Sequence, residues 1–204
     1  MFFGQSYSSV LVYFDGIESG LLTDFLYLYI MKEKLQYIDI EIDKLTRSIE
    51  NKTTGDNFQT DVLLLDSNDL KSITKGHGWL FDWKAEYRMA DRDIYKLIIR
   101  NNITIIQGLI SLTEREDHVY MHLIESAPFN RGKDKVYLGI PGNLVAFACK
   151  LSFHRGFEGY LSFRSKSTLL DHYEKTLGAK HIGGQIMVIN TISALKLIDK
   201  YFKE

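Results

Sequence analysis

The stretch HVYMHLIESAPFNRGKDKVYLGIPGNLVAFACK, residues 118–150, joins a strand-like pattern to a helix-like pattern through a loop that contains glycines. Its first nine residues, HVYMHLIES, have the two-residue alternation that is typical of a strand. The pattern becomes helical at Asn143, where apolar side chains recur three and four residues apart. Because the first N–H groups of a helix lack intrahelical partners and lie at its positive end, this arrangement predicts an anion site.

The loop before the helix carries residue types that suit a phosphate group. Three of them are cations and three are glycines, which let the backbone approach an anion closely. These residues are Arg131, Lys133 and Lys135, and Gly132, Gly139 and Gly142. Glycines ahead of a helix are also typical of plain turns, so the loop alone leaves both interpretations open.

The residues on either side extend the pattern into a regular order of elements. Upstream, we expect strands at residues 58–66, 94–100 and 104–112 and a helix at 67–75 that Ser67 caps. Downstream, we expect a strand at 159–163, a helix at 169–177, a strand at 185–190 and a helix at 193–202. Antiparallel strands that give way to β–α–β units predict an α/β fold with a mixed, mostly antiparallel central sheet and helices on both faces.

The N-terminal part of the chain is less regular. Residues 37–49 fit both a strand and a helix, and the polar run at residues 50–57 is typical of a linker. We therefore expect an N-terminal extension and linker at residues 1–57 and one domain at residues 58–204. The first thirty residues are rich in apolar side chains and could cover a partner surface, including a second copy of the chain.

Composition narrows the class of protein. The 204 residues include 25 basic and 26 acidic side chains, and this balance disfavours a nucleic-acid partner. A single cysteine, Cys149, excludes an intrachain disulfide and favours a reducing compartment. No basic residue precedes Lys32, and no stretch is long and uncharged enough to span a bilayer, so we expect a cytoplasmic protein with no membrane partner.

A second informative stretch is LLDHYEKTLGAKHIGG, residues 169–184. Tyr173 shares an apolar helical stripe with Leu169, Leu170 and Leu177, and Gly178 is expected to end the helix. A buried phenol requires a hydrogen-bond partner. Tyr173 is therefore either a core side chain with a satisfied hydroxyl or a proton donor in a site.

From about residue 58 to the C-terminus, the chain resembles the GCN5-related N-acetyltransferase superfamily. The resemblance is carried by HLIESAP followed by RG, a loop and an apolar helix, and by the tyrosine helix with the strand after it. Two features depart from the usual pattern of that family. KDKVYL separates Gly132 from Gly139, so the pyrophosphate loop is expanded, and Lys166 replaces an asparagine often found seven residues before the tyrosine.

The resemblance implies acetyl-coenzyme A as co-substrate, no metal, and direct transfer of an acetyl group to an amine on a small molecule or a peptide. Tyr173 would protonate the departing thiolate. The expected cofactor-binding residues are Leu123, Ile124, Glu125, Arg131, Gly132, Gly139, Gly142, Asn143 and Lys166. An aromatic and acidic cluster, Trp79, Asp82, Trp83 and Glu86, would bind the amine, although a core corner with solvated acids would show the same pattern.

Glu125 is the candidate base, because period two places it with Val119, Met121 and Leu123 on one strand face. A carboxylate that ends an apolar stripe can be desolvated, which raises its pKa, but a solvated glutamate at a strand end fits equally well. The alternative function is a non-catalytic protein of the same fold that binds acyl-coenzyme A or a protein partner. A third possibility is an interaction module of unrelated fold.

Overall fold

The computed structural model describes residues 37–202 except residues 39, 41 and 45–47. These residues belong to one compact unit that runs from Gln36 to Glu204. The boundary expected after residue 57 lies inside this unit, since Ile38, Ile42 and Ile49 are buried in its core. The first thirty-six residues, which were expected to belong to the extension, lie outside the described part of the chain.

The centre of the unit is a seven-stranded sheet in which neighbouring strands are antiparallel except for β6 and β8. Across the sheet the order is β3 (Thr60–Leu64), β4 (Asp93–Ile99), β5 (Asn102–Glu114), β6 (Val119–Ser126), β8 (Leu161–Arg164), β10 (Ile186–Ile189) and β9 (Lys180–Gly183). A smaller sheet has the order β2 (Asn57–Phe58), β1 (Ile49–Asn51) and β7 (Tyr137–Leu138). The expected mixed, mostly antiparallel sheet is therefore confirmed.

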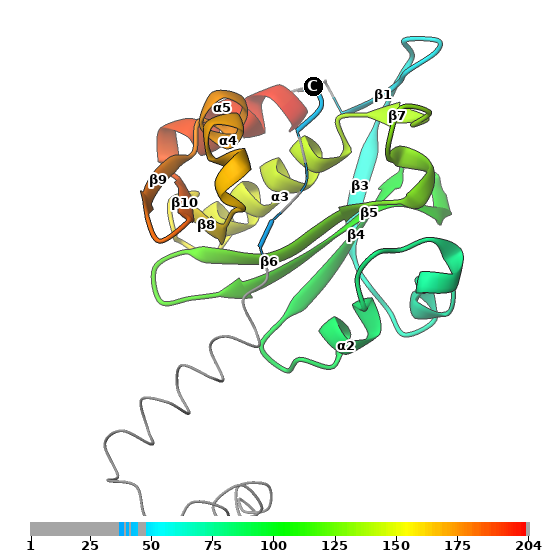
Figure 1. Ribbon diagram of the computed structural model, residues 1–204, viewed down its shortest axis with the longest axis horizontal. Helices are drawn as coiled ribbons and strands as arrows, with labels where there is room; N and C mark the ends of the chain where they lie inside the picture. Colours follow the sequence, from blue (N-terminus) through cyan, green and yellow to red (C-terminus); the bar gives the residue numbers. More distant parts are fainter. Residues whose placement is uncertain (1–36, 39, 41, 45–47, 203–204) are drawn as a thin grey trace, which may run out of the picture. The chain divides into compact units, whose positions relative to one another are not determined.

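Helices cover both faces of the large sheet, as expected (Figure 1). On one face lie α3 (Ile140–His154), α4 (Leu170–Leu177) and α5 (Thr191–Phe202), which share a large hydrophobic cluster with the sheet. The other face carries α2 (Trp83–Tyr87) and the short 3-10 turns η2 (Asp69–Lys71) and η3 (Lys75–His77) over a second cluster. Two hydrophobic clusters on opposite faces make the central strands almost fully buried.

Helix α3 begins earlier than the sequence pattern indicates. Gly139 is its N-cap with φ of 85°, a left-handed conformation that favours glycine, and Pro141 lies in the first turn, where its missing N–H costs nothing. Gly142 and Asn143 therefore lie inside the helix rather than in the loop. The expected start at Asn143 was wrong because a proline is compatible with a helix at this position.

A β-bulge at His122 divides β6 into two parts. In the pairing with β5, no residue lies opposite His122, which sits between Met121 and Leu123. Val119 and Met121 pack in the cluster beneath α3, whereas Leu123 packs in the cluster beneath α2. The expectation that all four residues share one face was wrong. Leu123 and Glu125 lie on the α2 side and Val119 and Met121 on the other, since period-two alternation changes phase at a bulge.

Three other local expectations differ from the structure. The helix expected at residues 67–75 is two 3-10 turns, and Thr74 rather than Ser67 provides a cap by accepting a hydrogen bond from His77 N–H. The hairpin partner β9 was not expected from the sequence. The ambiguous segment at residues 37–43 is not helical where it is described, and Ile38 forms a parallel bridge to Ser165. No helix among the described residues is long and apolar enough to cross a membrane.

Candidate active site

Strands β6 and β8 part from each other partway along their length. They pair only from Val119 opposite Leu161 to Met121 opposite Phe163, although β6 continues to Ser126. The parting begins at the bulge. The diverging ends of β6 and β8 are therefore not paired with each other, and Ile38 lies against the end of β8, where it forms a bridge to Ser165.

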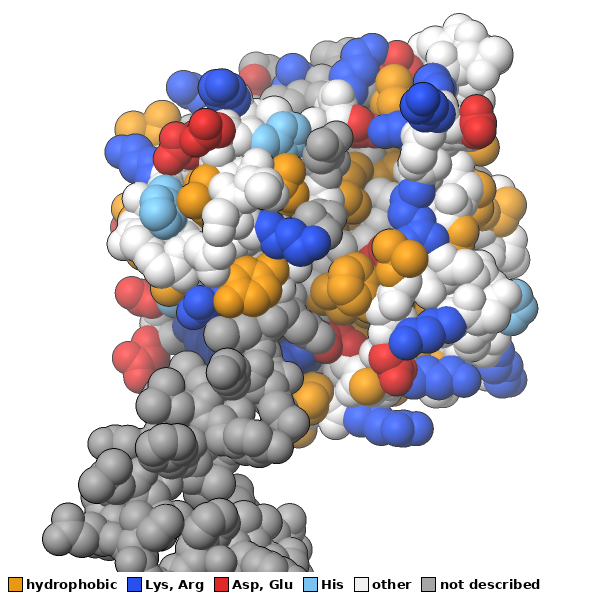
Figure 2. Space-filling model, viewed as in Figure 1, with side chains coloured by type: hydrophobic (Ala, Val, Ile, Leu, Met, Phe, Trp, Pro, Cys, Tyr) orange, Lys and Arg blue, Asp and Glu red, His pale blue; other side chains and the backbone are white. Residues whose placement is uncertain are grey.

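A cavity of about 400 Å³ lies beside the end of β6, and Ile40 and Asp43 are part of its lining. We call this cavity, together with the adjoining space between the diverging strands that Ile38, Ile40 and Ile42 fill, the groove. Tyr173 and His172 border the filled part and are not part of the cavity lining. The parting strand contributes its end to the lining, the loop after η4 (Pro128–Asn130) contributes cations, and the segment before α2 contributes apolar side chains. These residues include Ile124, Glu125, Ser126, Arg131, Lys133, Lys135, Leu80 and Phe81. In Figure 2, hydrophobic side chains near the middle of this face adjoin lysine and arginine side chains.

An anion lies in the part of the groove next to α3, and it belongs to the chain itself. One carboxylate oxygen of Asp43 accepts a hydrogen bond from Gly139 N–H at 3.1 Å, and the other accepts one from Lys135 Nζ at 2.9 Å. Gly139 is the N-cap of α3, so the carboxylate is placed at the positive end of a 15-residue helix. These donors bind a carboxylate of the chain itself, and their expected binding of a phosphate remains a prediction.

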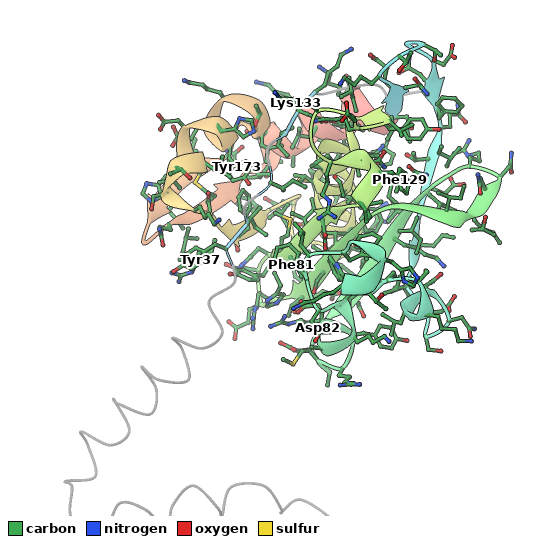
Figure 3. The ribbon with its side chains drawn as sticks, turned by 45° about the vertical axis from the view of Figure 1, so that its right-hand side comes forward. Tyr37, Phe81, Asp82, Phe129, Lys133 and Tyr173 are labelled. Carbon is green, nitrogen blue, oxygen red and sulfur yellow. The ribbon has the colours of Figure 1, made fainter. Side chains whose placement is uncertain are left out.

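Tyr173 lies in the groove wall and is almost fully buried, with an exposed fraction of 1%. Its ring packs edge-on against Phe163 of β8, with 5.3 Å between ring centroids. The hydroxyl donates to Ile40 O at 2.6 Å and accepts from Ile40 N–H at 3.3 Å. Figure 3 shows Tyr173 on the α4 side of the molecule and Phe81 and Phe129 on the α2 side.

His172 is a groove residue that sequence reasoning missed. Its Nε2 accepts a hydrogen bond from Ile42 N–H at 2.8 Å. Adjacent helical residues diverge by about 100° around the axis, so the stripe that contains Tyr173 gives no reason to expect its neighbour in the same site. Here both side chains reach the same extended segment because that segment runs across the helix rather than along one face.

Glu125 faces the α2 side of the sheet and is enclosed by donors. Its carboxylate accepts hydrogen bonds from Leu80 N–H at 2.7 Å, Trp83 Nε1–H at 2.7 Å and Arg131 Nη1 at 2.8 Å. A longer contact of 3.4 Å comes from Phe81 N–H, and the side chain is 2% exposed. The carboxylate therefore joins β6, the segment before α2 and the loop after η4. Its expected role as a base remains a prediction.

The expected amine-binding cluster is built into the second hydrophobic core. Trp79 and Trp83 are buried, and Glu86 binds Arg92 Nη1 at 2.5 Å and Ser111 Oγ at 2.6 Å. Asp82 is exposed and caps α2 by accepting from Ala85 N–H at 3.0 Å.

These contacts correspond to the core-corner alternative, with one difference: Glu86 is buried and ion-paired rather than solvated. Leu80 and Phe81, between the two tryptophans, are the residues of this segment that line the groove.

The other expected cofactor-binding residues lie in three different environments. Leu123 and Asn143 are buried, and the Asn143 amide nitrogen donates to Thr60 Oγ1 at 2.9 Å. Gly132 is exposed in the loop, with φ of 71°. Lys166 has an exposed side chain, while its backbone N–H donates to Ile38 O at 3.2 Å. The structure thus brings Ile124, Glu125, Arg131 and Gly132 together in the groove lining and places Leu123 and Asn143 in the core behind it.

His122, at the bulge, titrates unusually. Burial is the main cause and the nearby charge of Arg92 the second, and together they lower the pKa of His122 from 6.5 to about 4. Its Nε2 lies 2.8 Å from Thr113 Oγ1. The imidazole is therefore neutral at pH 7 and belongs to the buried polar network of the α2 side.

A larger cavity, about 870 Å³, lies under the other end of β6 and β8. Tyr120 and Ser162 line it, and they alternate with core residues that face α3, so this cavity opens on the opposite face of the sheet. Its rim is acidic, with Glu116, Asp117 and Glu158. We take the smaller groove as the candidate site because it combines anion donors, parting strands and the tyrosine.

No group of histidine, cysteine, aspartate and glutamate side chains in the described part of the chain has the geometry of a metal site. Cys149 is fully buried in α3, and burial raises the pKa of its thiol. Neither observation adds a catalytic group to the groove.

Comparisons with known proteins identify similar folds. No protein-family model matches the chain, and no curated protein matches its sequence. The solved structures that resemble it include spermidine/spermine N-acetyltransferase SpeG from Vibrio cholerae, with 15% identity and a TM-score of 0.45 over 68% of this chain and 98% of that chain.

Two further solved structures are similar to the same extent. A mutant form of the AtaT toxin, bound to the C-terminus of the antitoxin AtaR and acetyl-CoA, has 16% identity and a TM-score of 0.48, with 68% and 98% coverage. The KacTA–DNA complex has 14% identity and a TM-score of 0.47, also with 68% and 98% coverage. At this level of similarity the partners and ligands in those complexes are properties of those proteins alone.

Proposed function

We propose that this chain transfers an acetyl group from acetyl-coenzyme A to an amine by direct attack, without a covalent enzyme intermediate. The observation that carries the proposal is the groove, in which parting strands, a helix N-terminus with cationic side chains and a buried tyrosine hydroxyl meet. Each feature alone has a structural explanation. Together they supply the three groups that acyl transfer from a thioester requires: an anion anchor, unpaired strand backbone and a proton donor.

The donors in the groove suit the phosphates of coenzyme A. Gly139 N–H and Lys135 already bind a carboxylate there, so this donor set accepts an anion. Arg131 and Lys133 line the same cavity and add charge. In the proposed complex these four groups hold the pyrophosphate, and acetyl-coenzyme A supplies the acetyl group as an activated thioester.

Tyr173 is assigned as the proton donor to the thiolate. A phenol is protonated at neutral pH, since its unperturbed pKa is about 10, so it can hydrogen-bond the departing sulfur and pass it a proton. The proton that the amine loses as the amide forms goes to a base or to water, and the resulting phenolate takes a proton back from solvent. Its hydroxyl faces the groove and binds both backbone groups of Ile40, so it presents a donor and an acceptor to whatever lies there. The attacking amine must be neutral, because an ammonium has no lone pair.

For Glu125 the contacts support a positioning role alongside the base role that the sequence suggested. Four donors converge on its carboxylate, so its substitution would displace both the Leu80–Phe81 wall and Arg131. A pH profile separates the roles. If Glu125 is the base, Glu125→Gln removes the acidic limb of the kcat/KM profile. If it only positions its neighbours, the profile keeps its shape at a lower rate.

The second candidate function is a non-catalytic protein of the same fold. One observation favours it: residues of the chain itself occupy the groove beside Tyr173. Such a protein would bind acyl-coenzyme A or a protein partner and turn over no amine. A panel of polyamines, amino acids and peptides with acetyl-coenzyme A distinguishes the two functions.

Tyr173→Phe tests the proposed chemistry. We expect kcat to fall about a hundredfold, which is typical for the loss of one general acid, while the Kd for acetyl-coenzyme A stays the same or falls. Tyr95→Phe is the matched control, because Tyr95 is another buried tyrosine of the same hydrophobic cluster and lies on β4, away from the groove. The measurements are steady-state kinetics and calorimetric binding.

Equal kcat for wild type and Tyr173→Phe, with chemistry rate-limiting, would exclude the proton-donor role. The proposed function itself would be excluded if acetyl-coenzyme A bound neither wild type nor variants in which the contacts of Ile38 or Asp43 are removed.

A further inference from the structure

We propose that Ile38, Ile40, Ile42 and Asp43 act as an internal plug that imitates coenzyme A in the groove and must leave before the cofactor can bind. We call these four residues the plug. The inference rests on the proposed function, because it assigns the groove to coenzyme A. It adds a control step in which the enzyme is off until the plug is released.

The backbone of the plug is bound as a ligand would be, at successive points along the groove. Ile38 N–H donates to Arg164 O at 2.7 Å, and Ile38 O accepts from Lys166 N–H at 3.2 Å, beside the end of β8. Farther along, Ile40 bonds through both backbone groups to the Tyr173 hydroxyl, and Ile42 N–H bonds to His172. An extended chain that carries amides, such as the pantetheine arm, could use the same partners.

The chemistry of the plug also changes along its length in the order that the cofactor would require. Ile38 and Ile42 are 2% and 4% exposed and pack in the hydrophobic cluster. Asp43 follows them and carries a negative charge to Gly139 N–H and Lys135. Apolar chain with amides beside the tyrosine, then an anion at the helix N-terminus, is the order of pantetheine and pyrophosphate.

Competition follows from shared atoms. The Tyr173 hydroxyl, Gly139 N–H and Lys135 Nζ have partners in the plug, and the proposed complex needs all three for the cofactor. The two ligands therefore exclude each other, and the apparent Kd for coenzyme A is its intrinsic Kd divided by the fraction of molecules with an open groove.

The plug is held by contacts that can be broken without unfolding the sheet. Its described residues form the isolated bridge from Ile38 to Ser165. The side chains of Asp43 and Lys135 are 15% and 23% exposed, so water can replace their contact. The strands β6 and β8 keep their own pairing from Val119 to Met121 without it. Release of the plug is thus a local opening.

Amide hydrogen exchange measured residue by residue on the full chain tests the plug directly. Without ligand, we expect the amides of Ile38, Ile40 and Ile42 to be protected. Saturating coenzyme A should make them exchange about tenfold faster or more while Gly139 N–H remains protected, because the phosphates replace Asp43 there. If these residues were instead a fixed part of the sheet, their amides would become more protected when coenzyme A binds, and the plug would be contradicted.

Asp43→Asn weakens the plug by removing its charge. We expect the apparent Kd for coenzyme A to fall about twofold, the size of one partly exposed and screened ion pair. Asp134→Asn is the matched control: Asp134 is exposed in the loop between Lys133 and Lys135, so the control removes a negative charge near the same anion site without touching the plug. An equal gain in affinity for both variants would show that the loss of any nearby negative charge favours the anionic ligand, and it would overturn the inference.

Ile38→Ala weakens the plug without changing charge and should lower the apparent Kd about tenfold. Ile49→Ala is its control, since Ile49 is a buried isoleucine in β1, outside the groove lining. Both variants lose stability, but only Ile38→Ala should gain affinity.

The outcomes separate the inference from the proposed function. If coenzyme A binds and the plug amides then exchange faster, both the proposed function and the plug are supported. Both are also supported if coenzyme A binds the plug variants but not wild type. Binding without any change in plug exchange overturns the plug and leaves the enzyme. No binding by wild type, Asp43→Asn or Ile38→Ala overturns the proposed function, and the plug with it.

Discussion

Two carboxylates line opposite walls of the groove near the end of β6, and the two are bound differently. Glu125, on the α2 side, is 2% exposed and has four donors, from Leu80, Phe81, Trp83 and Arg131. Asp43, on the α3 side, is 15% exposed and has Gly139 N–H, Lys135 and its neighbour Lys44 N–H as donors.

This difference separates a permanent contact from a replaceable one. Loss of a buried carboxylate leaves buried donors without partners, which is costly, whereas water reaches the donors of a partly exposed one. The α2 side is therefore expected to be rigid, and the groove is expected to exchange its contents. Both properties suit a site in which one wall is fixed and the other binds a ligand.

The largest expected effect is on the rigid side. Glu125→Ala should lower the free energy of unfolding by about 3 kcal/mol, because Trp83 Nε1 and the Leu80 N–H lose their buried acceptor and Arg131 loses its partner. Urea unfolding measures this loss. Glu116→Ala, at an exposed glutamate in the turn before β6, is the control and should change stability by less than about 0.5 kcal/mol. A loss below about 1 kcal/mol for Glu125→Ala would contradict the rigid interpretation.

A smaller effect comes from His122, on the same side. Its pKa of about 4 lies below the unfolded value of 6.5, so the unfolded chain binds a proton first as the pH falls. Stability that is present above pH 6.5 is therefore lost between pH 6.5 and 4. Between pH 7 and pH 5, wild type should lose about 1 kcal/mol more than His122→Gln, after allowance for solvent screening at this half-buried ring.

The Gln variant keeps a partner for Thr113 Oγ1 but has no charge to gain. Parallel stability curves for wild type and His122→Gln over this pH range would show that the imidazole is solvated, contrary to its burial.

The smallest expected effect is on the groove side. Asp43→Ala should reduce the free energy of unfolding by about 0.5 kcal/mol, because the Asp43–Lys135 pair is partly exposed and screened. The reduction should shrink further in about 1 M salt. Thermal unfolding at two salt concentrations measures it, and a loss as large as that of Glu125→Ala would make the plug a fixed part of the core.

Much of the fold could be predicted from local patterns. The strands at β4, β5 and β6, the tyrosine helix and its end at Gly178, which has φ of 64°, follow from periodicity and from glycine's tolerance of left-handed backbone. The same patterns singled out Arg131, Gly139 and Tyr173, which lie at or next to the groove, while their roles in binding and chemistry remain predictions.

The bulge at His122 could not be predicted from the sequence. HVYMHLIES reads as one regular strand, and none of its residue types marks the position at which the extra residue is inserted. That single residue moves Leu123 and Glu125 to the other face and changes the surroundings of the candidate base. No local pattern pairs Ile40 with Tyr173 either, because the two residues are 133 positions apart.

The sequence by itself determined the strands β4, β5 and β6, the helix that carries Tyr173, and the cationic loop that precedes α3. These features depend on neighbours a few residues away, which the chain encodes directly. Only the tertiary structure decided which carboxylate reaches which donors, and that the ambiguous isoleucine segment lies against Tyr173. The physical reason is that partners distant in the chain are selected by burial and by the need to satisfy every buried polar group, and these are properties of the packed molecule as a whole.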